Sequence, residues 1–142
     1  MVDAMPALFI HVGLHKTGTT FLQQAVFPKL KSVQFLNGPN EIDLVRRMIA
    51  EDDASFEPSL YQDHFRPLIE SRPSLVSWEG LSGEPYLLYV NQIRNADRLV
   101  KIFPDASIIL VLRRQDTLLL SLYLQFINSG GSISLNEFLS FE

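Results

Sequence analysis

A glycine-rich turn between a short apolar run and a helical pattern constrains the fold of this chain most strongly. The turn spans residues 13–20 and reads GLHKTGTT. Residues 7–12 before it have the pattern of a buried strand, and the apolar residues of 21–27 recur at helical spacing. Glycines let the backbone approach a ligand closely, and the N–H groups and dipole of the first helical turn favour an anion. With Lys16, the turn predicts an anion-binding loop at a strand end; a tight turn with a solvated lysine is the alternative.

The position of the lysine distinguishes two kinds of phosphate loop. In nucleotide triphosphatases the second glycine of the loop is followed directly by lysine and then by serine or threonine. Here four residues separate Gly13 from Gly18, but Thr19 follows Gly18 and Lys16 stands two places before it. No predicted strand ends in the aspartate that would hold magnesium in such an enzyme. The loop therefore departs from the triphosphatase pattern.

The loop closely resembles the 5′-phosphosulfate loop of sulfotransferases. That loop reads lysine, serine or threonine, glycine, two threonines and a bulky apolar residue. This chain matches it at every place, and the resemblance implies that these residues bind the donor 3′-phosphoadenosine 5′-phosphosulfate (PAPS): Lys16, Thr17, Gly18, Thr19, Thr20 and Phe21. It also implies a catalytic role for Lys16, which would neutralise charge on the bridging oxygen of the leaving phosphate.

A second stretch resembles the 3′-phosphate motif of the same family, in which a strand-end arginine is followed by a serine eight residues later. Arg113 and Ser121 have this spacing, directly after the strand-like residues 107–112. A guanidinium there can bind a phosphate through two hydrogen bonds, and the serine can add a third. The family's usual asparagine and proline after the arginine are absent, so Arg114 is an alternative phosphate ligand. A surface ion pair of Arg113 with Asp116 is the purely structural reading.

Sulfotransferases use a histidine or a glutamate as the base that takes the acceptor's proton. Glu79 is our first choice, because it closes the predicted strand 74–78 and a carboxylate there is partly desolvated. A loop-bracing role is its alternative. His15 in the anion loop is the second candidate base, although contact with a phosphate or packing would equally explain it. His11, inside the first strand, is expected to be a core histidine.

The order of the predicted elements indicates an α/β fold with a parallel sheet and helices on both faces, and with ligands at the carboxyl ends of the strands. The resemblance implies a three-layer α/β/α, P-loop nucleotide-kinase-like fold with strand order 2-3-1-4. We find no candidate for the fifth strand that relatives usually add. Strands are predicted at 7–12, 33–36, 74–78 and 107–112, and helices at 19–30, 41–50 with Asn40 as N-cap, 57–71 and 87–103.

Composition bounds the remaining possibilities. A length of 142 residues with 46% hydrophobic content predicts one domain over residues 1–142. A net charge of −4 gives no general field for nucleic acid, so an anion must be bound by local cations. The lack of cysteine excludes disulfides and thiolate chemistry, and together with the absence of signal-peptide and membrane-span patterns it favours the cytoplasm. The acidic run 51–53 is interpreted as solvated surface, and no metal site is expected.

One segment is more apolar than a surface helix should be. Residues 118–127 are apolar on nearly all sides of a helix, which predicts that more protein covers them. The chain is then a truncated domain, a naturally short relative, or a protomer whose helix Leu118–Ile127 is covered in a homo-oligomer. The sequence leaves these three possibilities open.

The resemblance implies transfer of a sulfuryl group from PAPS to a hydroxyl or amine of a small-molecule or carbohydrate acceptor, without a metal. Two other classes remain as alternatives. A P-loop kinase or triphosphatase would bind a nucleoside triphosphate with magnesium, and a non-catalytic nucleotide-binding or interaction module would bind the donor without turnover. The acceptor would be selected by loops such as residues 81–89 and 130–134, whose sequence carries no recognisable code.

Overall fold

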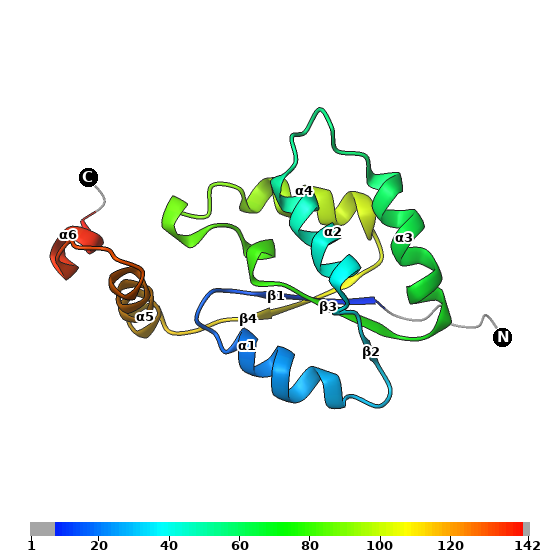
Figure 1. Cartoon of the computed structure of the whole chain (residues 1–142), viewed down its shortest axis with the longest axis horizontal. Coiled ribbons are helices and arrows are strands. Elements are labelled where there is room, and N and C mark those ends of the chain that lie inside the picture. The colour runs from blue at the N-terminus through cyan, green and yellow to red at the C-terminus, as the bar shows by residue number, and fades with distance from the viewer. Residues whose placement is uncertain (1–7, 141–142) are drawn as a thin grey trace.

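The computed structural model describes residues 8–140, which contain one four-stranded, all-parallel sheet (Figure 1). The strand order is β2-β3-β1-β4, which confirms the expected order. In the register of the sheet, Ile10 lies opposite Val76 on one side and Ile108 on the other. Ala7, where the first strand was predicted to begin, lies outside the described residues. The strands are β1 Leu8–Gly13, β2 Gln34–Phe35, β3 Ser74–Ser77 and β4 Ser107–Val111.

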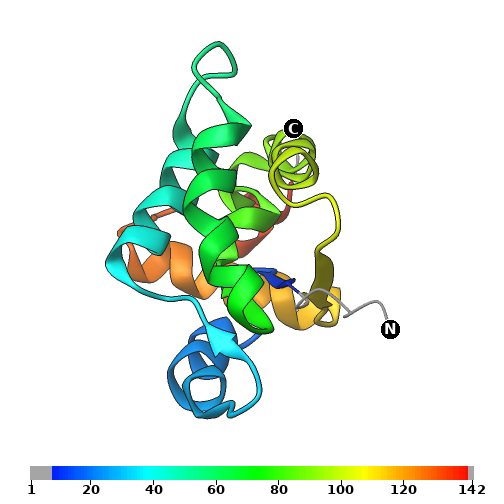
Figure 2. The same ribbon diagram turned by 90° about the vertical axis from the view of Figure 1, so that its right-hand side faces the viewer.

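Helices cover both faces of the sheet, as predicted (Figures 1 and 2). One face carries α2 Pro39–Ala50, α3 Pro58–Ser71 and α4 Gln92–Ile102. The opposite face carries the helical segment that follows the glycine-rich loop. This segment begins as α1 Thr19–Phe21, continues as the π-helix η1 Leu22–Val26 and ends as the 3₁₀ helix η2 Phe27–Lys29. Two further helices, α5 Gln115–Asn128 and α6 Leu135–Leu139, lie beyond the carboxyl ends of the strands.

The core lies between the sheet and the three helices α2, α3 and α4. Alternate side chains of β1 face it, because successive residues of a strand point to opposite faces. Full burial of such a side chain contributes about 1.5–3 kcal/mol relative to leaving it exposed. The core side chains are Leu8, Ile10, Leu36, Val45, Met48, Tyr61, Phe65, Val76, Leu81, Leu99 and Ile102.

A buried arginine ties the end of α2 to this core. Arg98 is 2% exposed, and its guanidinium donates to the carbonyls of Met48 and Glu51 and to the carboxylate of Asp53. The predicted reading of residues 51–53 as mere solvated surface was therefore wrong in part, since two of the three fix a buried charge. No group of three potential metal ligands occurs among residues 8–140.

Two predicted helix starts were wrong. The helix predicted from residue 41 begins at Pro39 with Gly38 as its cap, so Asn40 lies inside it. Proline is well suited to the first helical turn, because its φ is already helical and its missing N–H needs no partner. The helix predicted from residue 87 begins only at Gln92, because Leu88 and Tyr89 adopt left-handed backbone conformations with φ of 52° and 55°.

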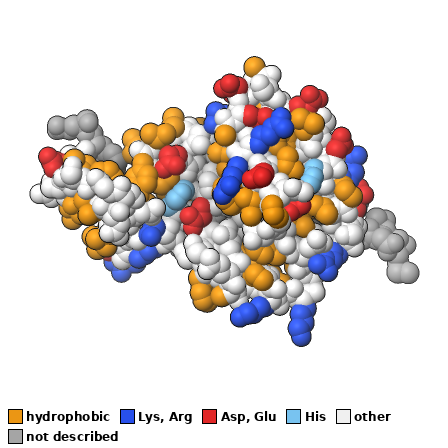
Figure 3. All heavy atoms as spheres, viewed as in Figure 1, with side chains coloured by type: hydrophobic (Ala, Val, Ile, Leu, Met, Phe, Trp, Pro, Cys, Tyr) orange, Lys and Arg blue, Asp and Glu red, His pale blue; other side chains and the backbone are white. Residues whose placement is uncertain are grey.

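The apolar character of residues 118–127 has a clear structural counterpart. Leu122 is buried, whereas Leu120 and Leu124 on the same helix are 49% and 54% exposed. Hydrophobic side chains gather over α5 and α6 at the left-hand end of the molecule in Figure 3. No helix within residues 8–140 is both long enough and apolar enough to cross a membrane.

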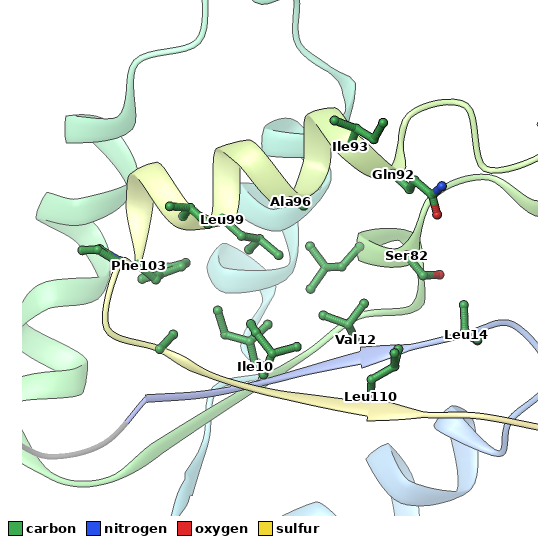
Figure 4. A pocket seen from close by; sticks show the side chains of 15 residues that line it. Ile10, Val12, Leu14, Ser82, Gln92, Ile93, Ala96, Leu99, Phe103 and Leu110 are labelled. Carbon is green, nitrogen blue, oxygen red and sulfur yellow. The ribbon is translucent and has the colours of Figure 1, made fainter.

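A groove lies above β1 and β4, beside α4. Its volume is about 470 Å³, and Figure 4 shows Val12, Leu110 and Leu99 around it. It is open because β4 lies at the sheet edge, with Ile108, Ile109 and Leu110 exposed. The groove is a continuation of the core that the described residues leave without a covering element.

Candidate functional site

The loop between β1 and α1 has a backbone that its two glycines make possible. Gly18 has a φ of 87°, and Lys16 also lies in the left-handed region with a φ of 64°. A side chain at Gly13 would place its Cβ 2.2 Å from the hydroxyl oxygen of Thr19. The amide of Leu22 donates to the carbonyl of Gly18 at 3.1 Å, which begins the helical segment. The loop therefore curls closely over the start of this segment.

The hydroxyls of the loop have different surroundings. Thr17 Oγ1 donates to the carbonyl of Leu14 at 2.5 Å, so it braces the loop from within. Thr19 is fully buried, and its Oγ1 has no hydrogen-bond partner among the described residues. Thr20 is exposed, and Phe21 is 66% exposed. A buried hydroxyl without a partner is costly unless something satisfies it.

Arg113, which follows β4, reaches the anion loop. Its Nη1 donates to the carbonyl of Lys16 at 2.8 Å, and its Nε donates to Thr117 Oγ1 at 3.1 Å. The ion pair with Asp116 is made by Arg114, at 2.6 Å, and not by Arg113. A guanidinium has five N–H groups, so Arg113 keeps donors for a phosphate. Lys16 forms no salt bridge with any carboxylate of residues 8–140.

Ser121 lies further along α5 on the same side as this arginine. Residues four apart are neighbours on a helix surface, so Thr117 stands between Arg113 and Ser121 in one stripe. Ser121 is half-buried and makes no side-chain hydrogen bond among the described residues. Thr117 is thus a third polar group of the stripe, and its hydroxyl donates to the carbonyl of Arg114 at 3.0 Å.

The glutamate after β3 sits on a braced turn. Glu79 is half-buried and opens the 3₁₀ turn η3 Glu79–Ser82. Ser82 Oγ lies 3.2 Å from the carbonyl oxygen of Gly13 and 2.8 Å from that of Glu79, so one hydroxyl joins this turn to the anion loop. Asn95 of α4 is fully buried and donates to the carbonyl of Gly80 at 3.0 Å. The backbone of Glu79 is therefore fixed relative to the loop.

His15, the second candidate base, packs beside a residue that sequence reasoning missed. Its ring centroid lies 6.4 Å from that of Tyr89. His15 Nδ1 and the Tyr89 hydroxyl are both buried without a partner among the described residues. Tyr89 comes to the loop because the chain turns through left-handed conformations at Leu88 and Tyr89. Bulky residues rarely adopt such conformations, so nothing in the sequence signals this turn.

Beneath the loop lies a hydrogen-bond network that sequence reasoning also missed. His11 is 1% exposed, as expected for a core histidine, and its Nδ1 lies 2.8 Å from Ser77 Oγ. Gln23 Nε2 donates to that hydroxyl and to the Ser77 carbonyl, at 3.1 and 3.0 Å. His11 Nε2 has no partner among the described residues. Burial lowers the pKa of His11, and the negative charge of Glu79 opposes this shift.

The residues that the sequence singled out therefore fall into two groups. Lys16, Thr19 and His15 belong to the loop, and Glu79 and Arg113 are joined to it through the Ser82 hydroxyl and the Lys16 carbonyl, whereas Thr20 and Phe21 are exposed. Searches against protein-family models, curated proteins and solved structures found no match to this chain. Its function must accordingly be argued from the residues at this edge of the sheet.

Proposed function

We propose that this chain transfers a sulfuryl group from PAPS to a hydroxyl or amine of an acceptor. The observation that carries the proposal is the hydrogen bond of 2.8 Å from Arg113 Nη1 to the Lys16 carbonyl, between residues 97 positions apart. The two stretches that resemble sulfotransferase motifs meet in space through this bond. A donor with a phosphate at each end needs two cationic loops side by side, and this arrangement supplies them.

The residues at the loop fit an anion with a phosphate-like group. Among residues 8–140, Lys16 has no carboxylate partner and Thr19 Oγ1 has no hydrogen-bond partner, and Gly13 leaves room for a tight loop. Arg113, with Thr117 and Ser121 along α5, would hold the 3′-phosphate, and Lys16 with the loop amides would hold the 5′-phosphosulfate. When bound, the donor supplies a sulfuryl group whose bond to the phosphate oxygen breaks as the acceptor's oxygen or nitrogen bonds to sulfur, leaving 3′-phosphoadenosine 5′-phosphate.

The chain's own side chains then stabilise the developing negative charge and accept one proton. The Lys16 ammonium neutralises the negative charge that develops on the departing phosphate oxygen. The Glu79 carboxylate takes the proton of the acceptor's hydroxyl or amine, and its braced turn keeps it beside the loop. His15 is the alternative proton acceptor, because its Nδ1 is free of partners among the described residues.

Calorimetric titration tests the proposal against the nucleoside triphosphate alternative. We expect 3′-phosphoadenosine 5′-phosphate to bind without metal, unchanged by a chelator, and more tightly than adenosine triphosphate with magnesium. Adenosine 5′-phosphate serves as the control that lacks the 3′-phosphate. Equal or tighter binding of the triphosphate with magnesium would overturn the sulfotransferase proposal and favour a P-loop kinase or triphosphatase.

A second measurement separates an enzyme from a binding module. With ³⁵S-labelled donor and a panel of alcohols, phenols, amines and sugars, we expect label to appear in at least one acceptor. Nucleotide binding without transfer to any acceptor would favour the non-catalytic module.

A further inference from the structure

A second cavity lies near the anion loop, without a residue of the loop in its lining, and has no part in the donor site described above. It has a volume of about 710 Å³, within the usual range of ligand pockets. One wall is the segment 85–89, and the other is formed by α5, α6 and the turn between them; both lie beyond the carboxyl ends of the strands (Figure 1). It is lined by Pro85, Tyr86, Leu88, Tyr89, Leu118, Leu119, Leu122, Phe126, Ser129, Gly131, Ile133, Glu137 and Phe138.

Both walls of this cavity are joined to the anion loop. Tyr89 on the first wall packs against His15, with ring centroids 6.4 Å apart. The second wall, α5, begins two residues after Arg113, whose guanidinium donates to the carbonyl of Lys16. The cavity is therefore separated from His15 of the anion loop by Tyr89, and its second wall continues from the arginine that we propose to hold the 3′-phosphate.

The lining of the cavity is almost entirely apolar. Ten of its thirteen residues are apolar or aromatic, and none is a lysine, arginine, histidine, asparagine or glutamine. The one carboxylate, of Glu137, accepts bonds of 2.7 Å from both the amide and the hydroxyl of Ser134, so it caps α6. These bonds also lower the pKa of Glu137.

The turn between the two helices is built around an aromatic ring. The ring centroid of Phe126 lies 5.5 Å from that of Phe138 and 6.4 Å from that of Tyr86. These contacts link α5 to α6 and to the opposite wall. A side chain at Gly131 would collide with the Phe126 ring at 2.1 Å, so the turn requires glycine there. These contacts fix the shape of the cavity wall.

We propose that this cavity binds the acceptor, and that the acceptor is an alcohol or phenol on an apolar body. A sugar carries hydroxyls on all sides, and each would lose its water here without gaining a partner, which costs free energy. An apolar body loses nothing polar, and its single hydroxyl can lie at the end of the cavity nearest the loop, where Tyr89 packs against His15. The proposal rests on the proposed function for the reaction, but the binding it predicts can be measured separately.

The groove beside α4 is the competing apolar site (Figure 4). Its residues come from the sheet, from η3, from α4 and from the connection between α4 and β4, and Leu14 is its one residue from the anion loop. Its Ser82 hydroxyl is already bonded to the carbonyls of Gly13 and Glu79. Apart from Ser82, Gln92 at the start of α4 is the polar side chain among its lining residues. The groove supplies a control position at Leu110.

Calorimetry with 2-naphthol and with methyl α-D-glucoside tests the proposal, with and without 3′-phosphoadenosine 5′-phosphate. We expect 2-naphthol to bind and the glucoside not to bind. Leu119→Trp fills the cavity and should weaken 2-naphthol binding at least about tenfold. Leu120→Trp, on the 49% exposed face of the same helix, and Leu110→Trp, in the groove, should leave it within about twofold.

If circular dichroism shows that Leu119→Trp does not fold, a milder variant tests the same cavity. Leu119→Ala removes apolar contact from the same wall and should weaken 2-naphthol binding at least about threefold. Binding of the glucoside in place of naphthol, no binding of either up to about 1 mM, or sensitivity to Leu110→Trp alone would overturn the proposal. Naphthol binding at this cavity without any nucleotide binding would instead refute the proposed function and leave the apolar site intact.

Discussion

β3 and β4 lie on either side of β1, yet they are packed very differently. All four residues of β3 are buried, whereas four of the five residues of β4 are exposed. The turn after β3 is fixed by Ser82 and by the buried Asn95. The segment after β4 is tied to the anion loop by the exposed Arg113. The proposed site therefore joins a preorganised half, with the candidate base, to a more loosely covered half, with the 3′-phosphate ligands.

The largest effect should come from the preorganised half. Glu79→Gln keeps the size of the side chain but removes its ability to accept a proton. We expect a loss of about 10²–10⁴ in turnover, the usual cost of losing a general base, with nucleotide affinity nearly unchanged. Turnover is measured with ³⁵S-labelled donor, and affinity by calorimetry with 3′-phosphoadenosine 5′-phosphate.

His15→Gln is the matched comparison for this variant, because His15 lies in the same half of the site. A small loss for Glu79→Gln together with a large one for His15→Gln would reassign the base to His15. Loss of nucleotide binding in a folded Glu79→Gln protein would make the glutamate a structural brace.

Lys16→Ala should have the next largest effect, on binding. Hydrogen bonds to a charged group contribute about 1.5–3 kcal/mol, so we expect affinity for 3′-phosphoadenosine 5′-phosphate to fall about 10–100-fold. Lys29→Ala removes the same charge at the far end of the same helical segment and is the control. Equal losses in both variants would mean that overall charge, not the loop, attracts the nucleotide.

These expectations depend on a fold that sequence patterns predict unevenly. The first strand and its loop were predictable, because an apolar run followed by closely spaced glycines has few other structures. The strand order came from the resemblance alone, since local patterns do not encode which strands pair. The start of α4 was missed because Leu88 and Tyr89 suit a helix by composition but adopt left-handed conformations.

The sequence singles out candidate site residues one by one, but it does not give the contacts between them. The spacing of Arg113 and Ser121 predicts one helix stripe, whereas the bond from Arg113 to the Lys16 carbonyl joins residues 97 apart. Asn95 gives no sequence signal, because its burial follows from its bond to the Gly80 carbonyl in another segment. Tyr89 could not be found either, because it reaches His15 through the left-handed turn at Leu88 and Tyr89.

Arg113 and Arg114 test the loosely covered half, where we expect a smaller effect. Arg113→Ala should reduce the preference for 3′-phosphoadenosine 5′-phosphate over adenosine 5′-phosphate about tenfold, or roughly 1.4 kcal/mol. Exposure to solvent keeps this below the value for a buried contact. Arg114→Ala should change the preference less than about twofold, because Arg114 is paired with Asp116. The reverse result would shift the phosphate ligand by one residue.

Ser121→Ala belongs to the same comparison and should have a smaller effect than Arg113→Ala. A neutral hydroxyl contributes about 0.5–1.5 kcal/mol, so the preference for the 3′-phosphate should fall about three- to tenfold. Thr117→Ala is the comparison variant, because Thr117 lies one turn before Ser121 on the same stripe of α5. An unchanged preference in Ser121→Ala with a reduced one in Thr117→Ala would move the second phosphate contact one turn toward the start of α5.

The smallest effect should be a pH dependence of the free energy of unfolding, caused by the buried His11 in the preorganised half. Burial lowers the folded-state pKa of His11 below its usual value of 6.5, so the unfolded chain takes up the proton first as the pH falls. The contribution of neutral His11 to the free energy of unfolding is therefore complete above pH 6.5 and is lost as the pH falls through the folded-state pKa. Urea unfolding, followed by fluorescence of the single tryptophan, should show lower stability at about pH 5 than at about pH 7.5.

His11→Asn keeps a polar atom near Ser77 and should flatten this dependence, whereas His64→Asn on the half-exposed face of α3 should not. An unchanged slope in His11→Asn would show that the buried histidine is not the group that titrates, and that the preorganised half owes its stability to packing and to the Ser82 and Asn95 bonds.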